Sequence, residues 1–78
     1  MKTDAQLHLD VVAALYARHR VNAGRIGVEV RNGIVTLAGS VTSYFEKWEA
    51  ERATQSVSGV KDIDIELDVA PLWFEQAT

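Results

Sequence analysis

The fold of this chain is decided by the stretch Val28-Glu29-Val30-Arg31-Asn32-Gly33-Ile34-Val35-Thr36-Leu37-Ala38-Gly39-Ser40-Val41. Asn32 and Gly33 separate two runs of alternating apolar residues, and both residues tolerate the positive φ of a two-residue type I′ turn. The pattern therefore predicts a β-hairpin. A two-residue loop sets the register, which places Val28 opposite Leu37.

One face of the predicted hairpin is almost wholly aliphatic, because successive side chains of a strand point to opposite sides. This face consists of Ile26, Val28, Val30, Val35, Leu37 and Val41. A two-stranded ribbon cannot keep such a face out of water alone. The flanking segments are therefore expected to cover it.

A first helix is predicted before the hairpin. Thr3-Asp4-Ala5-Gln6 has the form of a capping box, and apolar residues then recur at helical spacing as far as Arg18. Arg18, His19 and Arg20 are expected to complement the dipole at the C-terminus of this helix. The face expected to cover the hairpin consists of Leu7, Val11, Ala14 and Leu15.

A second helix is predicted after the hairpin. Ser43-Tyr44-Phe45-Glu46 forms a second capping box, and the helical pattern runs from Tyr44 to about Val57. Gly59 is the expected stop, as a left-handed cap residue. The face expected to lie close to the sheet consists of Ala50, Ala53 and Val57.

A final strand is predicted from about Asp62 to Val69, where apolar and acidic residues alternate. The order of elements predicts an α+β fold, a two-layer sandwich in α-β-β-α-β order with two helices on one face of a three-stranded sheet. The domain is expected to span residues 4–69, and residues 70–78 form a C-terminal tail.

Several motifs in these elements occur together in a known family. They are the helix face Val11, Ala14 and Leu15, then Ile26-x-Val28-x-Val30, Asn32-Gly33-x-Val35-x-Leu37-x-Gly39-x-Val41, Ala50 with Ala53, and Val57-x-Gly59-Val60. From about Asp4 to Val69 the chain resembles the BON domain, named for bacterial osmotically inducible and nodulation proteins. The resemblance implies the α-β-β-α-β fold, no enzymatic activity, and a role in binding phospholipid or attaching to membranes. Potassium sensing is another context of the family.

Composition narrows the range of partners. The chain has 78 residues, a net charge of -3 and no cysteine, which fits one small domain without disulfides or thiolate metal sites. The acidic balance argues against nucleic acid as a partner. The expected partners are a phospholipid or membrane surface, another protein domain, or a second copy. Without a signal sequence the chain is expected to be cytoplasmic as it stands, and periplasmic if it is an excised module.

The sequence predicts no catalytic residues, no cofactor and no metal site. His8 and His19 are about three helical turns apart, too far to bind one metal ion. A weak alternative is a cation site on the acidic side of the last strand. It would use Asp62, Asp64, Glu66 and Asp68, although neighbours on one side of a strand are about 7 Å apart and cannot all reach one ion.

Aromatic and apolar residues outside the predicted core are the candidates for lipid or partner binding. They are Tyr44, Phe45 and Trp48 in the second helix and Leu72, Trp73 and Phe74 in the tail. Exposed aromatic side chains on a helix indicate an interface. The alternative is that the tail packs over the helix aromatics, within the chain or across a dimer.

The leading hypothesis is a non-catalytic BON-type binding module that associates with phospholipid or membranes and works within a larger protein or oligomer. The alternative is a soluble cytosolic regulatory or cation-sensing module, with potassium as the candidate ion.

Overall fold

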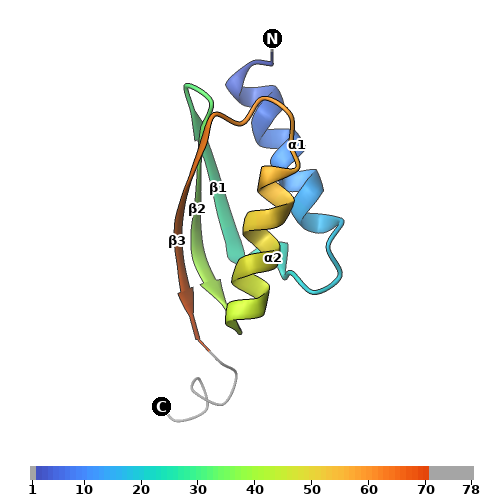
Figure 1. The fold of residues 1–78 in the computed structure, drawn as a ribbon, viewed down its shortest axis with the longest axis vertical. Helices are drawn as coiled ribbons and strands as arrows, with labels where there is room; N and C mark the ends of the chain where they lie inside the picture. The colour runs from blue at the N-terminus through green and yellow to red at the C-terminus, as the bar shows by residue number, and fades with distance from the viewer. Residues whose placement is uncertain (1, 71–78) are drawn as a thin grey trace.

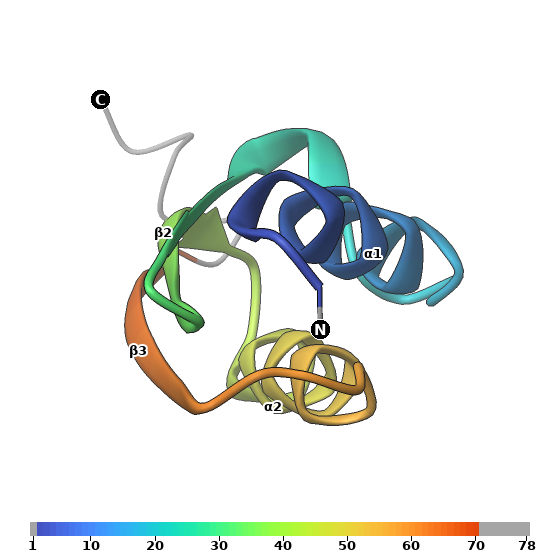
Figure 2. The same ribbon diagram turned by 90° about the horizontal axis from the view of Figure 1, so that it is seen from above.

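The computed structural model describes residues 2–70, and their two helices cover one face of a three-stranded sheet (Figures 1 and 2). The predicted α+β fold and its element order are confirmed. Residues 71–78, which make up most of the predicted tail, lie outside the described part. The elements are α1 (Asp4–Tyr16), a 3-10 turn η1 (Ala23–Arg25), β1 (Ile26–Arg31), β2 (Ile34–Val41), α2 (Tyr44–Gln55) and β3 (Asp62–Val69).

The central strand of the sheet is β2, with β1 antiparallel on one side and β3 parallel on the other. The predicted hairpin register is confirmed, since Val28 pairs with Leu37 and Val30 with Val35. Parallel neighbours need a crossover connection, and α2 supplies it between β2 and β3. This topology brings the end of β3 beside the end of β2.

The hairpin turn has the predicted backbone conformation, with φ of 54° at Asn32 and 81° at Gly33. The backbone N–H groups of these two residues donate to the Asp4 carboxylate at 2.8 and 3.1 Å. The Gly33 carbonyl accepts a hydrogen bond from the backbone N–H of Lys61 at 2.9 Å. The tip of the hairpin is thus bonded to the start of α1 and to the segment before β3.

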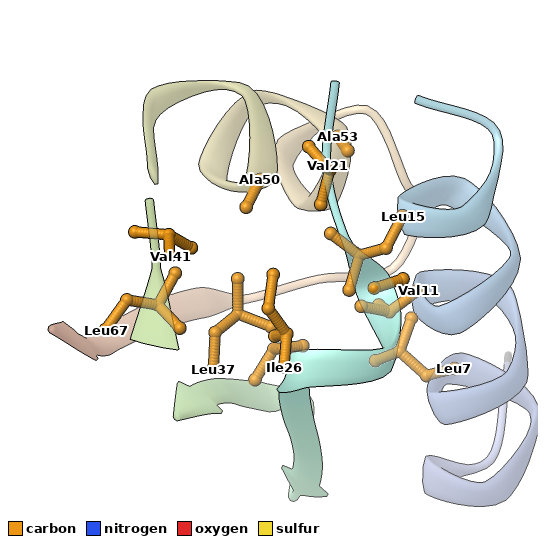
Figure 3. Packing of buried hydrophobic residues seen from close by; sticks show 12 residues of the cluster. Leu7, Val11, Leu15, Val21, Ile26, Leu37, Val41, Ala50, Ala53 and Leu67 are labelled. Atoms are coloured by element: carbon orange, nitrogen blue, oxygen red, sulfur yellow. The ribbon is translucent and has the colours of Figure 1, made fainter. Parts of the chain in front are cut away.

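The core lies between the sheet and the two helices (Figure 3). The predicted helix faces supply much of it, since Leu7, Val11 and Leu15 are buried in α1 and Ala50 and Ala53 in α2. The remaining buried apolar residues are Val21, Ala23, Ile26, Val35, Leu37, Val41 and Leu67. Ala14, Val28, Val30 and Val57 are partly buried and pack against this cluster.

Both helices end earlier than the sequence predicts. Helix α1 ends at Tyr16, so Arg18 follows the helix and its guanidinium instead pairs with the Glu49 carboxylate of α2 at 3.4 Å. Helix α2 ends at Gln55, and Ser56 is its C-cap, with a hydroxyl that donates to the Ala53 carbonyl at 2.6 Å. Gly59 has a positive φ of 100°, but it lies in the following turn and does not stop the helix.

Gly39 in β2 is the glycine with the least room for a side chain. Its φ is +131°, and an added Cβ would overlap the carbonyl oxygen of Arg25. Neither the backbone conformation nor the neighbouring main chain can accommodate a methyl group there. Gly27, on the adjacent strand, has more room, since an added Cβ would lie 3.6 Å from the nearest atom, the carbonyl oxygen of Ala38.

We expect Gly39→Ala to lower the free energy of unfolding by about 2 kcal/mol or more, through strain at positive φ and overpacking against Arg25. Gly27→Ala is the matched control and is expected to change it by less than about 1 kcal/mol. Chemical denaturation of the two variants measures both values. Equal effects of the two substitutions would contradict the close approach of β2 to Arg25.

Candidate functional site

The outer side of α2 presents three aromatic side chains to solvent. Tyr44 is 76% exposed, and Phe45 and Trp48 are each 48% exposed. They lie off the buried face of the helix, as its periodicity predicts, because Ala50 and Ala53 occupy that face. The rings of Phe45 and Trp48 are in contact, with centroids 5.9 Å apart and planes inclined by 40°. Phe45 and Trp48 thus form one continuous aromatic surface.

Two guanidinium groups lie over this aromatic pair. The Cζ atom of Arg20 is 5.4 Å from the centroid of the Phe45 ring, and that of Arg52 is 5.1 Å from the Trp48 ring. These are cation–π distances. Arg52 belongs to the same helix, whereas Arg20 comes from the connection between α1 and η1. The sequence pattern does not place Arg20 at this site, because nothing in it relates Arg20 to a residue 25 positions later.

A shallow hollow of about 210 Å³ adjoins the aromatic residues, between α2 and β3. It is lined by Tyr44, Lys47, Trp48, Glu51 and Ile65. Lys47 adds a third cation to this side of the molecule. We call the surface formed by Tyr44, Phe45 and Trp48 with Arg20, Lys47 and Arg52 the aromatic face of α2.

Glu46 lies between Phe45 and Trp48 in the sequence but points into the protein and is only 4% exposed. Its Oε1 accepts hydrogen bonds from the backbone N–H and the hydroxyl of Thr42, at 2.7 and 2.9 Å. Its Oε2 accepts one from the backbone N–H of Asn22 at 2.8 Å. The carboxylate thereby joins the start of α2 to the connection that carries Arg20.

The second predicted capping box is therefore only half correct. The Ser43 hydroxyl accepts a hydrogen bond from the Glu46 backbone N–H at 3.0 Å, as the motif requires. The Glu46 side chain, however, bonds to Thr42 and Asn22 instead of returning to the Ser43 backbone. In α1 both halves of the motif are present, between Thr3 and Gln6.

The surroundings of Glu46 keep its carboxyl group ionised. Burial by itself raises the pKa of Glu46, but hydrogen bonds from Asn22 and Thr42 and the charge of Arg25 together lower it below its ordinary value. A carboxyl group that is nearly inaccessible to solvent thus retains its charge because three donors replace water.

A model of the BON domain family matches residues 3–71 of the chain. The chain belongs to the BON domain family. BON domains are binding-type modules associated with membrane, lipid or protein interactions. A search among curated proteins found no match. Within residues 2–70 of this BON domain, no helix is long and apolar enough to cross a membrane.

The other predicted site residues are not brought together with the aromatic face. Asp62, Asp64, Glu66 and Asp68 are exposed on the sheet face opposite the helices, alternating with the partly or fully buried residues of β3. In the described part of this BON domain, no three His, Cys, Asp or Glu side chains form a group that could hold a metal ion. The tail residues Leu72, Trp73 and Phe74 lie outside the described residues.

We expect Glu46→Gln to lower the free energy of unfolding by about 1–3 kcal/mol, because the amide NH2 must then face a backbone or hydroxyl donor in a buried site. Glu66→Gln, exposed in β3, is the matched control and should change it by less than about 0.5 kcal/mol. Urea denaturation at neutral pH measures both values. A Gln variant as stable as the control would contradict the bonding described for Glu46.

Lowering the pH should distinguish the contribution of the Glu46 charge to the stability of the fold from the contribution of its packing. Because the pKa of Glu46 is lowered in the folded protein, its charge stabilises the fold above about pH 4.5, the ordinary glutamate pKa. This contribution is lost as the pH falls through the folded pKa. We therefore expect the stability difference between wild type and Glu46→Gln to shrink in acid. A difference that is constant from neutral to strongly acidic pH would contradict the lowered pKa.

Proposed function

We propose that this BON domain is a non-catalytic module that associates with phospholipid membranes through the aromatic face of α2. The observation that carries the proposal is the exposed pair of Phe45 and Trp48 with a guanidinium group over each ring. Aromatic side chains with polar or charged neighbours favour the interfacial region of a bilayer. A folded domain can insert such a surface into the headgroup layer without unfolding.

The distribution of charge supports the same orientation. The chain carries a net charge of -3, but the four acidic residues of β3 lie on the open face of the sheet, away from the helices. The aromatic face instead contains Arg20, Lys47 and Arg52. The acidic residues of α2 are partly offset, since Glu49 pairs with Arg18 at 3.4 Å. A membrane with anionic lipid would therefore meet the cationic side of the domain first.

The expected mode of association is peripheral and reversible. Three exposed aromatic residues offer limited apolar area, and stable anchoring to a bilayer requires more than one such signal. We therefore expect the domain to work within a larger protein or an oligomer, where several weak contacts act together.

Vesicle co-sedimentation tests the proposal. We expect wild type to bind phosphatidylcholine vesicles containing phosphatidylserine, and Phe45→Ser/Trp48→Ser to bind at least about tenfold more weakly. Losing about 1.4 kcal/mol of apolar burial suffices for that factor, and one buried aromatic side chain contributes this much. Leu9→Ser is the matched control, because Leu9 is also a large apolar residue, 67% exposed in α1.

The control variant should bind vesicles as wild type does. Equal binding by wild type and the double variant would show that the aromatic face is not the membrane site. Failure of wild type to bind any vesicle would contradict the proposal and leave a protein partner for this face. Binding that high salt abolishes would indicate that charge, and not aromatic insertion, dominates.

A further inference from the structure

We infer that, away from a membrane, the aromatic face of α2 is covered by the chain's own segment Leu72-Trp73-Phe74. This contact would regulate lipid binding, and in that respect it rests on the function proposed above. The occupant follows from where the described chain ends, from the length of the segment beyond that point, and from the charges around the aromatic face.

The chain leaves the sheet beside the start of α2. The backbone N–H of Ala70 donates to the carbonyl of Val41 at 2.7 Å, and Val41 is three residues before Tyr44. The parallel pairing of β2 and β3 causes this arrangement, because both strands end at the same edge of the domain (Figure 1). Ala70, the last described residue, therefore lies next to the end of α2 that carries Tyr44 and Phe45.

The segment has sufficient reach. Leu72 and Phe74 are two and four residues beyond Ala70, which corresponds to about 7–14 Å of extended chain. Along α2, the distance from Tyr44 to Trp48 is about 6 Å at the rise of a helix. The three apolar residues can thus lie along the whole aromatic face without movement of β3.

The segment is also chemically complementary to the face. Three consecutive apolar side chains would meet Tyr44, Phe45 and Trp48, and aromatic pairs gain stability beyond the area that they bury. The next residue, Glu75, is opposite in charge to Arg20, Lys47 and Arg52.

A short tether gives the segment an effective concentration in the millimolar range, so it outcompetes a second copy at ordinary protein concentrations. Lipid can bind only the fraction of molecules whose aromatic face is uncovered. The contact therefore lowers the apparent affinity for membranes.

Tryptophan fluorescence of the full chain tests the contact without lipid. The chain has two tryptophans, so Trp48 is the only one left both in a Trp73→Phe reference and in a Leu72→Ser/Trp73→Ser/Phe74→Ser variant. We expect the triple-serine variant to emit at longer wavelength and to be quenched more strongly by acrylamide. Leu9→Ser, added to the reference, is the control and should change neither property.

The same two chains are then compared on phosphatidylcholine–phosphatidylserine vesicles. Removing the covering segment should increase the affinity by about fivefold or more, the lower range of coupling between competing contacts. Identical emission and quenching in the two chains would overturn the inference. Weaker vesicle binding by the triple-serine variant would overturn it too, because the segment would then insert together with α2.

Dilution of the Trp73→Phe reference tests whether a second copy of the chain, and not its own segment, covers the aromatic face. Emission that moves to longer wavelength on dilution would overturn the inference in favour of a second copy, whereas constant emission supports a contact within one chain. If no variant binds vesicles but the emission difference persists, the proposed function fails and the covering contact stands.

Discussion

The orientation of helix α2 depends on the buried carboxylate of Glu46. Its two oxygens accept hydrogen bonds from Thr42 just before the helix and from Asn22 in a distant connection. These bonds fix the rotation of the first turn, so that Glu46, Ala50 and Ala53 face the interior of the protein while Phe45 and Trp48 face solvent. The same carboxylate holds the connection whose Arg20 lies over Phe45. The buried hydrogen bonds of Glu46 thus determine which side chains α2 exposes to solvent.

The exposed aromatic residues are not needed to fill the core. The sheet and α1 supply the larger buried side chains, such as Leu7, Leu15 and Leu37, and α2 approaches through alanines. A helix with small inward residues can pack closely and still carry large residues on its outer side. Burial therefore does not account for the aromatic residues at Tyr44, Phe45 and Trp48, which is consistent with the interaction proposed for this face.

Periodicity predicts the elements and the buried faces of this BON domain because both follow from local spacing. The Asn32-Gly33 turn fixes the hairpin register, and the spacing of Leu7, Val11 and Leu15 fixes the inner face of α1. Contacts distant in sequence were not predictable in this way. The Ser43–Glu46 motif correctly indicates the start of α2, but the partners of the Glu46 side chain depend on how α1, η1 and β2 meet.

Local spacing also fails to predict where the helices end and which residues complete the candidate site. Gly59 is a reasonable stop by residue type, yet α2 ends earlier, at Gln55. The aromatic residues of the site were identified from the helical wheel, because their exposure follows from the period of the helix. The helical wheel does not identify the cation over Phe45, because Arg20 reaches this ring only through the tertiary fold.

Paramagnetic broadening tests the proposed membrane-facing role of α2 most directly. The full chain would be bound to bicelles that contain a spin-labelled phospholipid, and the broadening of each backbone amide would be measured by NMR. We expect the strongest broadening at Tyr44, Phe45, Trp48 and Arg20, and the weakest at Asp64 and Glu66 on the open face of the sheet. Strongest broadening at β3, or equal broadening on both sides of the domain, would contradict it.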